Sequence, residues 1–538
     1  MGPAGGTRPH DVTESERDLG VASVTPRISL PAAFLVLLLG TSPAVGAAEV
    51  EPVALTLREA VLLALENNLD LKIERFEPYI AHQEIRRAQG EFDPFLNLAL
   101  SVRGQELPIN SALEQQANQA TITDDSLTPE GTVGGKLVTG TRYSLGLLAP
   151  GTQTDNPNRL FDEYYRPVFG IELVQPLLKG FGPEVNKIRI RQAEKGERIA
   201  RHAVEAKVLT VIQDVETRYW TLHKAQQHVR VVGKSVEFAT DLVQRLRRLF
   251  AVGLTTALDV RQAEVAVEAR RGELARAQAD LANAQAQLAL VTDPKAGVSA
   301  RLRTVDAPRE EGIPVDLAGK LERAIAQRPE IRRQEQVVEQ LTLQVKLDQN
   351  AVLPNLDVVG SAGYTGLAGK GSGPRVTTPP TSSQGSDYFD AFNNFFTPDG
   401  NLTWSVGLRL QIPFGNREAL GRLEQSKLRR AQEEMRLALL KSQIGIEVET
   451  AFQEMTAAWG QILAASEGVR LAQEQLAAQE RQLEAGLSTV RRVLEAQEAV
   501  AFAEDQRIEI VERYARARSR LAAAGASNLD SYQLMVPP

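Results

Sequence analysis

The stretch FAVGLTTALDVRQAEVAV, residues 250–267, returns later in the chain as LEAGLSTVRRVLEAQEAV, residues 483–500. Gly253 and Gly486 are 233 positions apart, and the Leu and Thr residues that follow them keep the same separation. Each glycine interrupts a long run of helix-compatible sequence, and glycine ends a helix at positive φ without the steric penalty of a Cβ atom. The pattern predicts two helical hairpins that turn at these glycines.

The two hairpins belong to a duplication that covers most of the chain. Residues 68–71 align with 328–331 at a separation of 260, Pro176 aligns with Pro413 at 237, and residues 215–217 align with 448–450 at 233. The drop from 260 to 237 means that the segment after Pro94 is 23 residues longer than its counterpart after Pro354. The predicted organisation is an N-terminal extension with a signal peptide (1–48), a first repeat (49–291), an equatorial linker (292–316), a second repeat (317–527) and a C-terminal tail (528–538).

Composition excludes several classes of protein. The chain has 538 residues, 5% aromatic residues and a net charge of −7, and it contains no cysteine. The absence of cysteine rules out disulfides, thiolate metal sites, a cysteine nucleophile and a lipidated cysteine anchor. The charges are spread through helical segments, with no basic stripe of the kind that binds nucleic acid.

The N-terminal region is typical of a secretory signal peptide. Arg27 precedes the apolar run LPAAFLVLLLG, residues 30–40, and the small-residue segment AVGAA, residues 44–48, offers a cleavage site. A single membrane anchor is the alternative, but the run is too short to span a bilayer. We therefore expect a mature chain that begins near Ala48 or Glu49 and is exported.

Four segments alternate apolar and polar residues with the period of two that defines a half-exposed strand. They are FLNLALSV (95–102), VFGIELV (168–174), NLDVVGSAGY (355–364) and NLTWSVGLRLQI (401–412). Their length suits tilted strands that cross an outer membrane, and a soluble half-buried sheet is the alternative. Polar loops are expected at 104–165 and 365–400, with LVTGTRYSLGL, residues 137–147, as a candidate for a further strand.

The rest of the chain predicts long helices. A rise of 1.5 Å per residue gives about 105 Å for each of two long helices and about 50 Å for each of four shorter ones. The expected spans are 56–88, 182–251 and 258–290 in the first repeat, and 318–350, 415–484 and 491–523 in the second. Their apolar stripes are rich in alanine, which favours close, coiled-coil-like packing. A plain antiparallel coiled coil would explain the helices but not the strands.

Taken together, these features resemble the TolC-type outer-membrane efflux protein family. The resemblance rests on the signal peptide, LTLREAVLLALENNLDL (55–71), the prolines that flank the strands, the turn VGLTTALDV (252–260) and the tandem duplication. It implies a mainly α fold with a membrane β-barrel, in which each protomer of a homotrimer gives four strands to a twelve-stranded barrel and its helices to a periplasmic tunnel. Four strands cannot close a barrel alone, and open sheet edges are not tolerated in hydrocarbon, so cyclic assembly is expected on physical grounds as well.

The resemblance also assigns roles to residues near the two turns. A periplasmic adaptor protein is expected to dock at the tip residues Val252, Gly253, Leu254, Ala485, Gly486 and Leu487. A gate is expected at Asp259, Arg492 and Glu495, because a ring of like charges in a narrow mouth selects ions. Arg492 stands where the family often has Asp, and it would pair with Asp259 across neighbouring hairpins; ordinary solvated charges are the alternative.

The predicted function is a passive outer-membrane channel of a tripartite efflux or type I secretion system. An inner-membrane pump or ABC transporter would drive export through the adaptor, and a secreted or periplasmic coiled-coil scaffold is the alternative. We expect no enzyme, cofactor, metal site or lipid anchor. The five histidines lack ligand spacing, and GYTGLAGKGSG, residues 363–373, departs from the phosphate-loop pattern.

Overall fold

The computed structural model describes residues 53–110, 120–156, 158–293, 301–312, 316–371, 385–396, 401–528 and 532. The predicted signal peptide and most of the predicted C-terminal tail lie outside these ranges. Among the described helices, none carries an apolar stretch long enough to cross a membrane.

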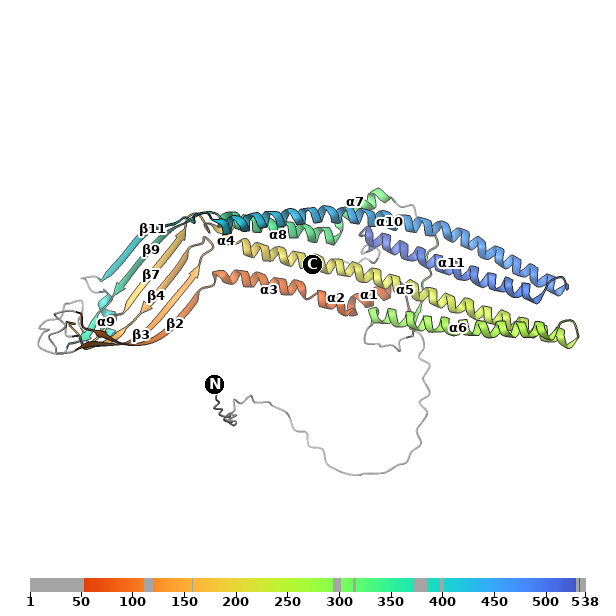
Figure 1. Ribbon diagram of the computed structural model, residues 1–538, viewed down its shortest axis with the longest axis horizontal. Helices are drawn as coiled ribbons and strands as arrows, with labels where there is room; N and C mark the ends of the chain where they lie inside the picture. The colour runs from red at the N-terminus through yellow and green to blue at the C-terminus, as the bar shows by residue number, and fades with distance from the viewer. Residues whose placement is uncertain are drawn as a thin grey trace, which may run out of the picture. The chain divides into compact units, whose positions relative to one another are not determined.

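Helices make up most of both repeats (Figure 1). Those of the first repeat are α1 (Leu57–Asn67), α2 (Leu69–Glu74), α3 (Glu77–Gln89), the 3-10 turn η1 (Gly90–Phe92), α4 (Pro183–Asn186), α5 (Ile188–Ala251) and α6 (Ala257–Thr292). Those of the second are α7 (Leu317–Gln327), α8 (Pro329–Ala351), α9 (Tyr388–Asn393), the 3-10 turn η5 (Asn394–Phe396), α10 (Arg417–Glu484) and α11 (Val490–Ala524). The predicted long helices and the helices that follow the two turns are confirmed.

Two predicted helices are interrupted, so the expectation of continuous helices over 56–88 and 318–350 was wrong. Asn68 leaves the helical region at ψ 122°, and its side chain accepts a 2.9 Å hydrogen bond from the Leu71 amide to cap α2. Arg328 has ψ 127° because the proline ring of Pro329 disfavours the helical conformation of the residue before it. Both breaks fall at the same place in the repeat, because residues 68–71 align with 328–331.

The helices form a layer four helices wide. Next to the sheet, the neighbours are α3, α5, α8 and α10, in that order. Farther from the sheet, α6 takes the place of α3 beside α5, and α11 takes the place of α8 between α5 and α10. The long helices α5 and α10 therefore run the full length of the helical layer (Figure 1). Beside each of them, shorter helices follow one another end to end and together match its length, as predicted.

Apolar side chains of each repeat form a core along this layer. One core gathers Val61, Ile212, Tyr219 and Leu288 around α5, and a second gathers Ile331, Val448 and Tyr514 around α10. Each of these side chains is almost fully buried. The duplication thus produces two equivalent cores, one in each repeat.

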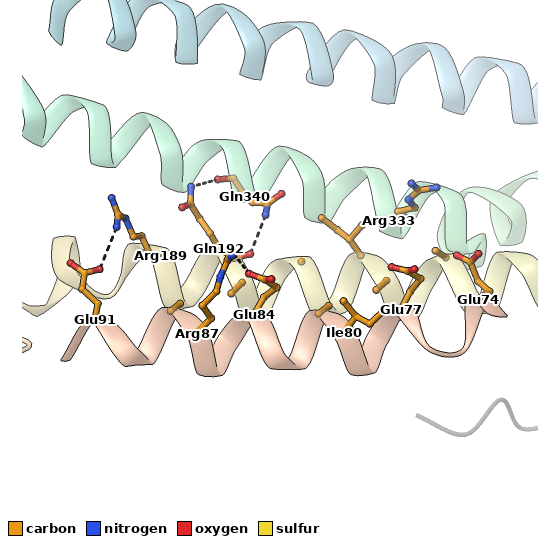
Figure 2. A pocket seen from close by; sticks show the side chains of 17 residues that line it. Glu74, Glu77, Ile80, Glu84, Arg87, Glu91, Arg189, Gln192, Arg333 and Gln340 are labelled. Atoms are coloured by element: carbon orange, nitrogen blue, oxygen red, sulfur yellow. Dashed lines mark hydrogen bonds and ion pairs between the residues drawn. The ribbon is translucent and has the colours of Figure 1, made fainter. Parts of the chain in front are cut away.

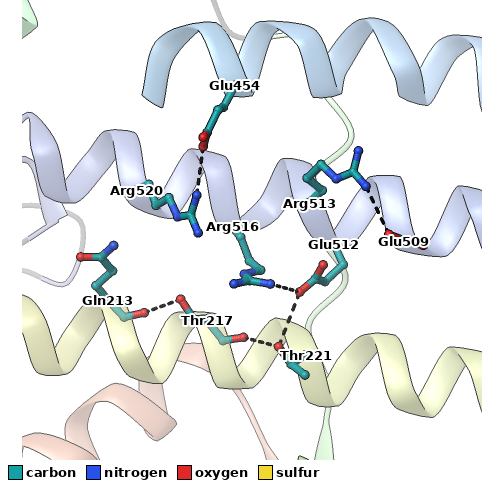
Figure 3. Close-up of polar contacts among 9 residues, drawn as sticks. All are labelled: Gln213, Thr217, Thr221, Glu454, Glu509, Glu512, Arg513, Arg516 and Arg520. Atoms are coloured by element: carbon teal, nitrogen blue, oxygen red, sulfur yellow. Dashed lines mark hydrogen bonds and ion pairs between the residues drawn. The ribbon is translucent and has the colours of Figure 1, made fainter. Parts of the chain in front are cut away.

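Polar contacts connect α5 of the first repeat to α11 of the second (Figure 3). The Thr221 hydroxyl donates to Glu512 over 3.5 Å, and Arg516 pairs with the same carboxylate at 3.1 Å. Arg520 then pairs with Glu454 of α10 at 3.0 Å. Because Glu512 is buried, its pairing with Arg516 offsets the cost of removing the charge from water.

The strands form one large sheet and one small one. In chain order they are β1 (Val53–Leu55), β2 (Phe95–Pro108), β3 (Thr121–Lys136), β4 (Arg142–Leu148), β5 (Gly151–Thr154), β6 (Glu163–Tyr165), β7 (Val168–Pro176), β8 (Leu302–Thr304), β9 (Asn355–Thr365), β10 (Ala368–Lys370) and β11 (Leu402–Gln411). The small sheet pairs β1 with β8 in parallel, which places part of the predicted linker beside the start of the first repeat. The large sheet is antiparallel throughout.

All four predicted strands are present as β2, β7, β9 and β11, but the large sheet contains two further long strands. Its main path is β2, β3, β4, β7, β9 and β11 (Figure 1). The candidate strand at 137–147 corresponds to β4, whereas β3 occupies a segment expected to be a polar loop. The four predicted strands are therefore confirmed, and the expectation of a polar loop over 104–165 is wrong, because β3 and β4 add two strands to the same sheet there.

The remaining short elements gather at the end of the sheet far from the helices. There β5, β6 and β10 extend the sheet from β3, and α9 packs against β10. Phe161, Ala368, Ala391 and Phe395 are buried among them. The segment expected as a loop at 365–400 therefore contains β10, α9 and η5 within its described residues.

Candidate functional site

The first hairpin turns through a glycine at the end of α5. Gly253 has φ +80°, its amide donates to the Phe250 carbonyl at 3.0 Å, and the Leu254 amide reaches back to the Leu249 carbonyl at 2.9 Å. These two bonds satisfy carbonyls that the end of a helix leaves without partners. A Cβ added at Gly253 would meet no other atom within 4 Å, so the backbone angle alone requires glycine.

The second hairpin repeats this turn at the end of α10. Gly486 has φ +72°, its amide donates to the Leu483 carbonyl at 3.0 Å, and the Leu487 amide donates to the Gln482 carbonyl at 2.8 Å. Here too a Cβ would meet nothing within 4 Å. The structure confirms that both Gly-Leu pairs are helix-reversing turns.

Both turns expose apolar side chains. Val252 is 68% exposed, Leu254 75% and Leu487 76%. Just behind the turns, the two hairpins share a core to which α5 contributes Leu246, α6 contributes Val260 and α11 contributes Val490 and Val493. The exposed residues therefore stand on a packed base, and both tips lie at the same end of the helical layer (Figure 1).

The side chain of Asp259 caps the start of helix α6 at the first tip. Its carboxylate accepts hydrogen bonds from the Thr256 hydroxyl at 2.6 Å, the Thr256 amide at 3.1 Å and the Thr255 hydroxyl at 3.1 Å, while the Thr256 hydroxyl accepts from the Asp259 amide. This reciprocal pair is a capping box at the start of α6. The hydrogen bond from Thr256 is the largest influence that lowers the pKa of Asp259 below its ordinary value.

The second tip lacks the equivalent box. Thr489 caps α11 without a side-chain hydrogen bond. Arg492 stands where Asp259 stands in the first hairpin, and its side chain has no acceptor atom for the Thr489 amide. Both Arg492 and Glu495 are exposed, and Glu495 pairs with Arg491 at 2.9 Å. Within the described part of this single chain, no ion pair joins Arg492 to Asp259. A latch between them across neighbouring hairpins stays a prediction.

A groove lies between α3, α5 and α8 (Figure 2). The residues of α5 that line it include the small residues Ala193 and Gly196. Arg189 pairs with Glu91 at 3.6 Å on one rim, and the Gln340 side chain donates to the Gln192 carbonyl at 3.1 Å on the other. The described residues contain no cluster of three side chains suited to a metal ion. We interpret the groove as a place where helices pack, not as a site of chemistry.

A wall of strands at one end and two helical hairpins at the other define the class of protein to which this chain belongs, that of outer-membrane channel proteins. The model of the family described as "Outer membrane efflux protein" matches residues 142–292 and 321–526, which is more than half of the chain. The chain therefore belongs to the outer membrane efflux protein family, and it is an outer-membrane protein whose helical part lies in the periplasm.

Solved structures share this fold at low sequence identity. The CmeC outer membrane channel of Campylobacter jejuni is 17% identical with a TM-score of 0.60, and the alignment covers 88% of this chain and 89% of that one. The outer membrane protein VceC of Vibrio cholerae is 16% identical with a TM-score of 0.61, covering 87% and 95%. The open state of the MtrE outer membrane channel of Neisseria gonorrhoeae is 16% identical with a TM-score of 0.57, covering 88% and 89%. No curated protein sequence is detectably similar to this chain.

Proposed function

We propose that three copies of this chain form a passive export conduit that an inner-membrane pump or ABC transporter drives through a periplasmic adaptor. Family membership supports an efflux channel. The observation that carries the finer proposal is the pair of hairpin tips, which present Leu254 and Leu487 in the same exposed geometry from two repeats of one chain.

Exposed leucines on a packed base suit a docking surface. Burying a leucine side chain is worth about 1.5–3 kcal/mol, so a partner that covers both tips in every copy gains several times that amount. An adaptor with apolar residues at the end of its own helical hairpin matches this surface. The trimer multiplies the contact by three, since each protomer presents both tips.

The edges of the large sheet support assembly into a closed ring. The two edge strands, β2 and β11, are exposed along their whole length, and their outer backbone groups have no ladder partner within the described chain. Long, uncovered edges pair with other strands, and they are not tolerated in hydrocarbon. Joining β11 of one copy to β2 of the next closes both open edges of the path from β2 to β11.

The proposal is tested by measuring assembly and docking together. The purified protein should have the mass of a trimer, and photo-crosslinkers placed at Leu254 and Leu487 in cells should capture a periplasmic adaptor that has a helical hairpin. Leu254→Ser with Leu487→Ser should remove that crosslink. Leu290→Ser, which changes an exposed leucine at the far end of α6, should leave it unchanged. A monomer, or crosslinks only to unrelated proteins, would contradict the proposal.

The scaffold alternative makes a different prediction. A coiled-coil scaffold would bind partners through its helices but would not need the sheet to cross a membrane. Deleting the sheet would then leave its function intact. Family membership and the exposed apolar face of the sheet favour the conduit.

A further inference from the structure

We propose that the wall of this channel closes with eighteen strands, and that the β3–β4 hairpin of the first repeat widens its outer opening. The proposal rests on the trimer described above. It follows from the six long strands that each copy contributes.

The hairpin is inserted in the wall and does not hang from its rim. β3 pairs with β2 in an unbroken register from Phe95 opposite Gly134 to Pro108 opposite Thr121. On the other side, β4 pairs with β7 from Arg142 opposite Val174 to Leu148 opposite Val168. Because β3 and β4 lie between β2 and β7, both strands are part of the wall of the first repeat.

The residues of the hairpin also follow the two faces of the wall. Val133 lies opposite Leu96, and Leu145 opposite Ile171, so one face stays apolar across β2, β3, β4 and β7. On the other face, Thr132 lies opposite Asn97. This alternation is what a strand needs when one side meets lipid and the other meets water.

Local packing fits strand β3 to its neighbour. A Cβ added at Gly134 would lie 2.7 Å from the ring of Phe95, its partner on β2. The aromatic ring therefore covers the space that the glycine leaves open. Cross-strand packing of this kind fixes the register of two strands.

An even number of strands per copy allows the ring to close. The path from β2 to β11 is antiparallel at each step, so the two edge strands run in opposite directions. When β11 of one copy meets β2 of the next, the new pair is again antiparallel. Three copies of six strands then complete the wall.

The change in strand number has a large geometric effect. With strands 4.8 Å apart and tilted by about 40°, a twelve-stranded ring has a backbone diameter of about 24 Å, and an eighteen-stranded ring about 36 Å. Barrels of 16–18 strands leave an open aqueous channel, whereas narrower ones are more easily filled by side chains. The inserted hairpin would therefore widen the wall about 1.5-fold.

Cysteine crosslinking tests the strand order without removing any element. The chain has no cysteine of its own. Asn97→Cys with Thr132→Cys should form a disulfide within one chain, and so should Leu145→Cys with Ile171→Cys, because each pair is in register. Asn97→Cys with Val133→Cys is the matched control, since these side chains point to opposite faces. Failure of both registered pairs in a protein that forms trimers would overturn the proposal.

Electron cryo-microscopy of the full-length protein in lipid nanodiscs then counts the strands. A trimer with eighteen strands is the expected result, and a trimer with twelve would overturn this inference while leaving the conduit in place. A protein that forms no trimer would instead contradict the proposed function.

Deleting residues 121–148, which joins the chain at the outer end of the sheet, should give a trimer with twelve strands and a wall about 1.5-fold narrower. If that variant does not fold, the crosslinks and the strand count still decide.

Polymers of graded size test the width of the outer opening. Polyethylene glycols added only on the outer side of a planar bilayer should enter the native opening and lower its conductance at sizes that the deletion variant excludes. Equal size limits in the two proteins would contradict a widened opening. Because the polymers enter from the outer side, the result does not depend on the state of the periplasmic tips.

Discussion

The two hairpin tips use the same backbone turn but start their second helices differently. Gly253 and Gly486 have nearly the same positive φ and the same pair of backbone hydrogen bonds. The next helix is held by a capping box between Thr256 and Asp259 in the first hairpin, and by no side-chain cap in the second. The reversal of the chain tolerates little change, whereas the residue one turn later is free to diverge. The second tip is therefore the one we expect to open more easily.

The largest effect should come from the turn glycines. Gly253→Ala and Gly486→Ala should each destabilise their tip by about 1–2 kcal/mol, because alanine is strained at positive φ. Hydrogen exchange of the tip amides measures this opening. Gly233→Ala, in the middle of α5 with no atom within 4 Å of the new methyl, is the control and should stabilise its helix by about 1 kcal/mol. If Gly253→Ala and Gly486→Ala stabilised their helices in the same way, the positive φ of the two glycines would not be what requires glycine at the turns.

The next effect separates the cap of Asp259 from its charge. Asp259→Ala removes both and should cost about 1 kcal/mol at the start of α6. Asp259→Asn keeps an acceptor for the Thr256 amide and should cost less. If the two variants open the tip equally, as seen by hydrogen exchange over residues 256–262, the capping box is not what holds the first tip.

A gain of stability should follow from copying the first tip into the second. Arg492→Asp supplies the missing acceptor opposite Thr489 and should stabilise the start of α11 by about 0.5–1 kcal/mol. It also removes a positive charge from the N-terminus of a helix, where positive charge is unfavourable. Arg492→Gln removes the positive charge and supplies a weaker acceptor. Its stabilisation of the start of α11 should therefore lie between that of the parent protein and that of Arg492→Asp. Unchanged exchange rates in Arg492→Asp would contradict the comparison.

The smallest effect is a dependence on pH that only the first tip should show. The pKa of Asp259 is lowered in the folded protein, so its stabilisation is fully present above the ordinary value of 3.8 and is lost as the pH falls through the lower folded pKa. Protection of the α6 start should therefore decrease in acid relative to Asp259→Asn. The α11 start, which has no such carboxylate, should show no matching decrease.

The sequence predicted the hairpins well because their signals are local. A glycine within a helical run, followed by Leu and a capping Thr, specifies the reversal without help from distant residues. The breaks at Asn68 and before Pro329 also had local causes, but both were outweighed by the strong helical pattern around them. The equivalence of the two repeats could be predicted because the separation between matching residues is constant within each of three blocks, at 260, 237 and 233 positions.

Strand β3 was missed for a physical reason. Asp124, Asp125 and Glu130 give the segment the composition of a loop, and Pro129 argues against an inner strand. The alternation of apolar and polar positions along β3 can be recognised only beside its partner strand β2, which supplies apolar neighbours on one face. The signal that would have found it was the 23 extra residues after Pro94, which are about enough for a hairpin of two wall strands. The predicted docking and gate roles depend on other copies and partners, which one chain does not contain.

Single-channel recording in planar bilayers tests the central claim most directly. The purified trimer should give discrete conductance steps, and Arg492→Ala should change the open conductance or the opening frequency more than Asp259→Asn does, because the second tip is held less firmly. A membrane-inserted trimer that gives no steps would contradict the assignment as a channel. Equal behaviour of the two variants and the parent would contradict the unequal roles of the tips.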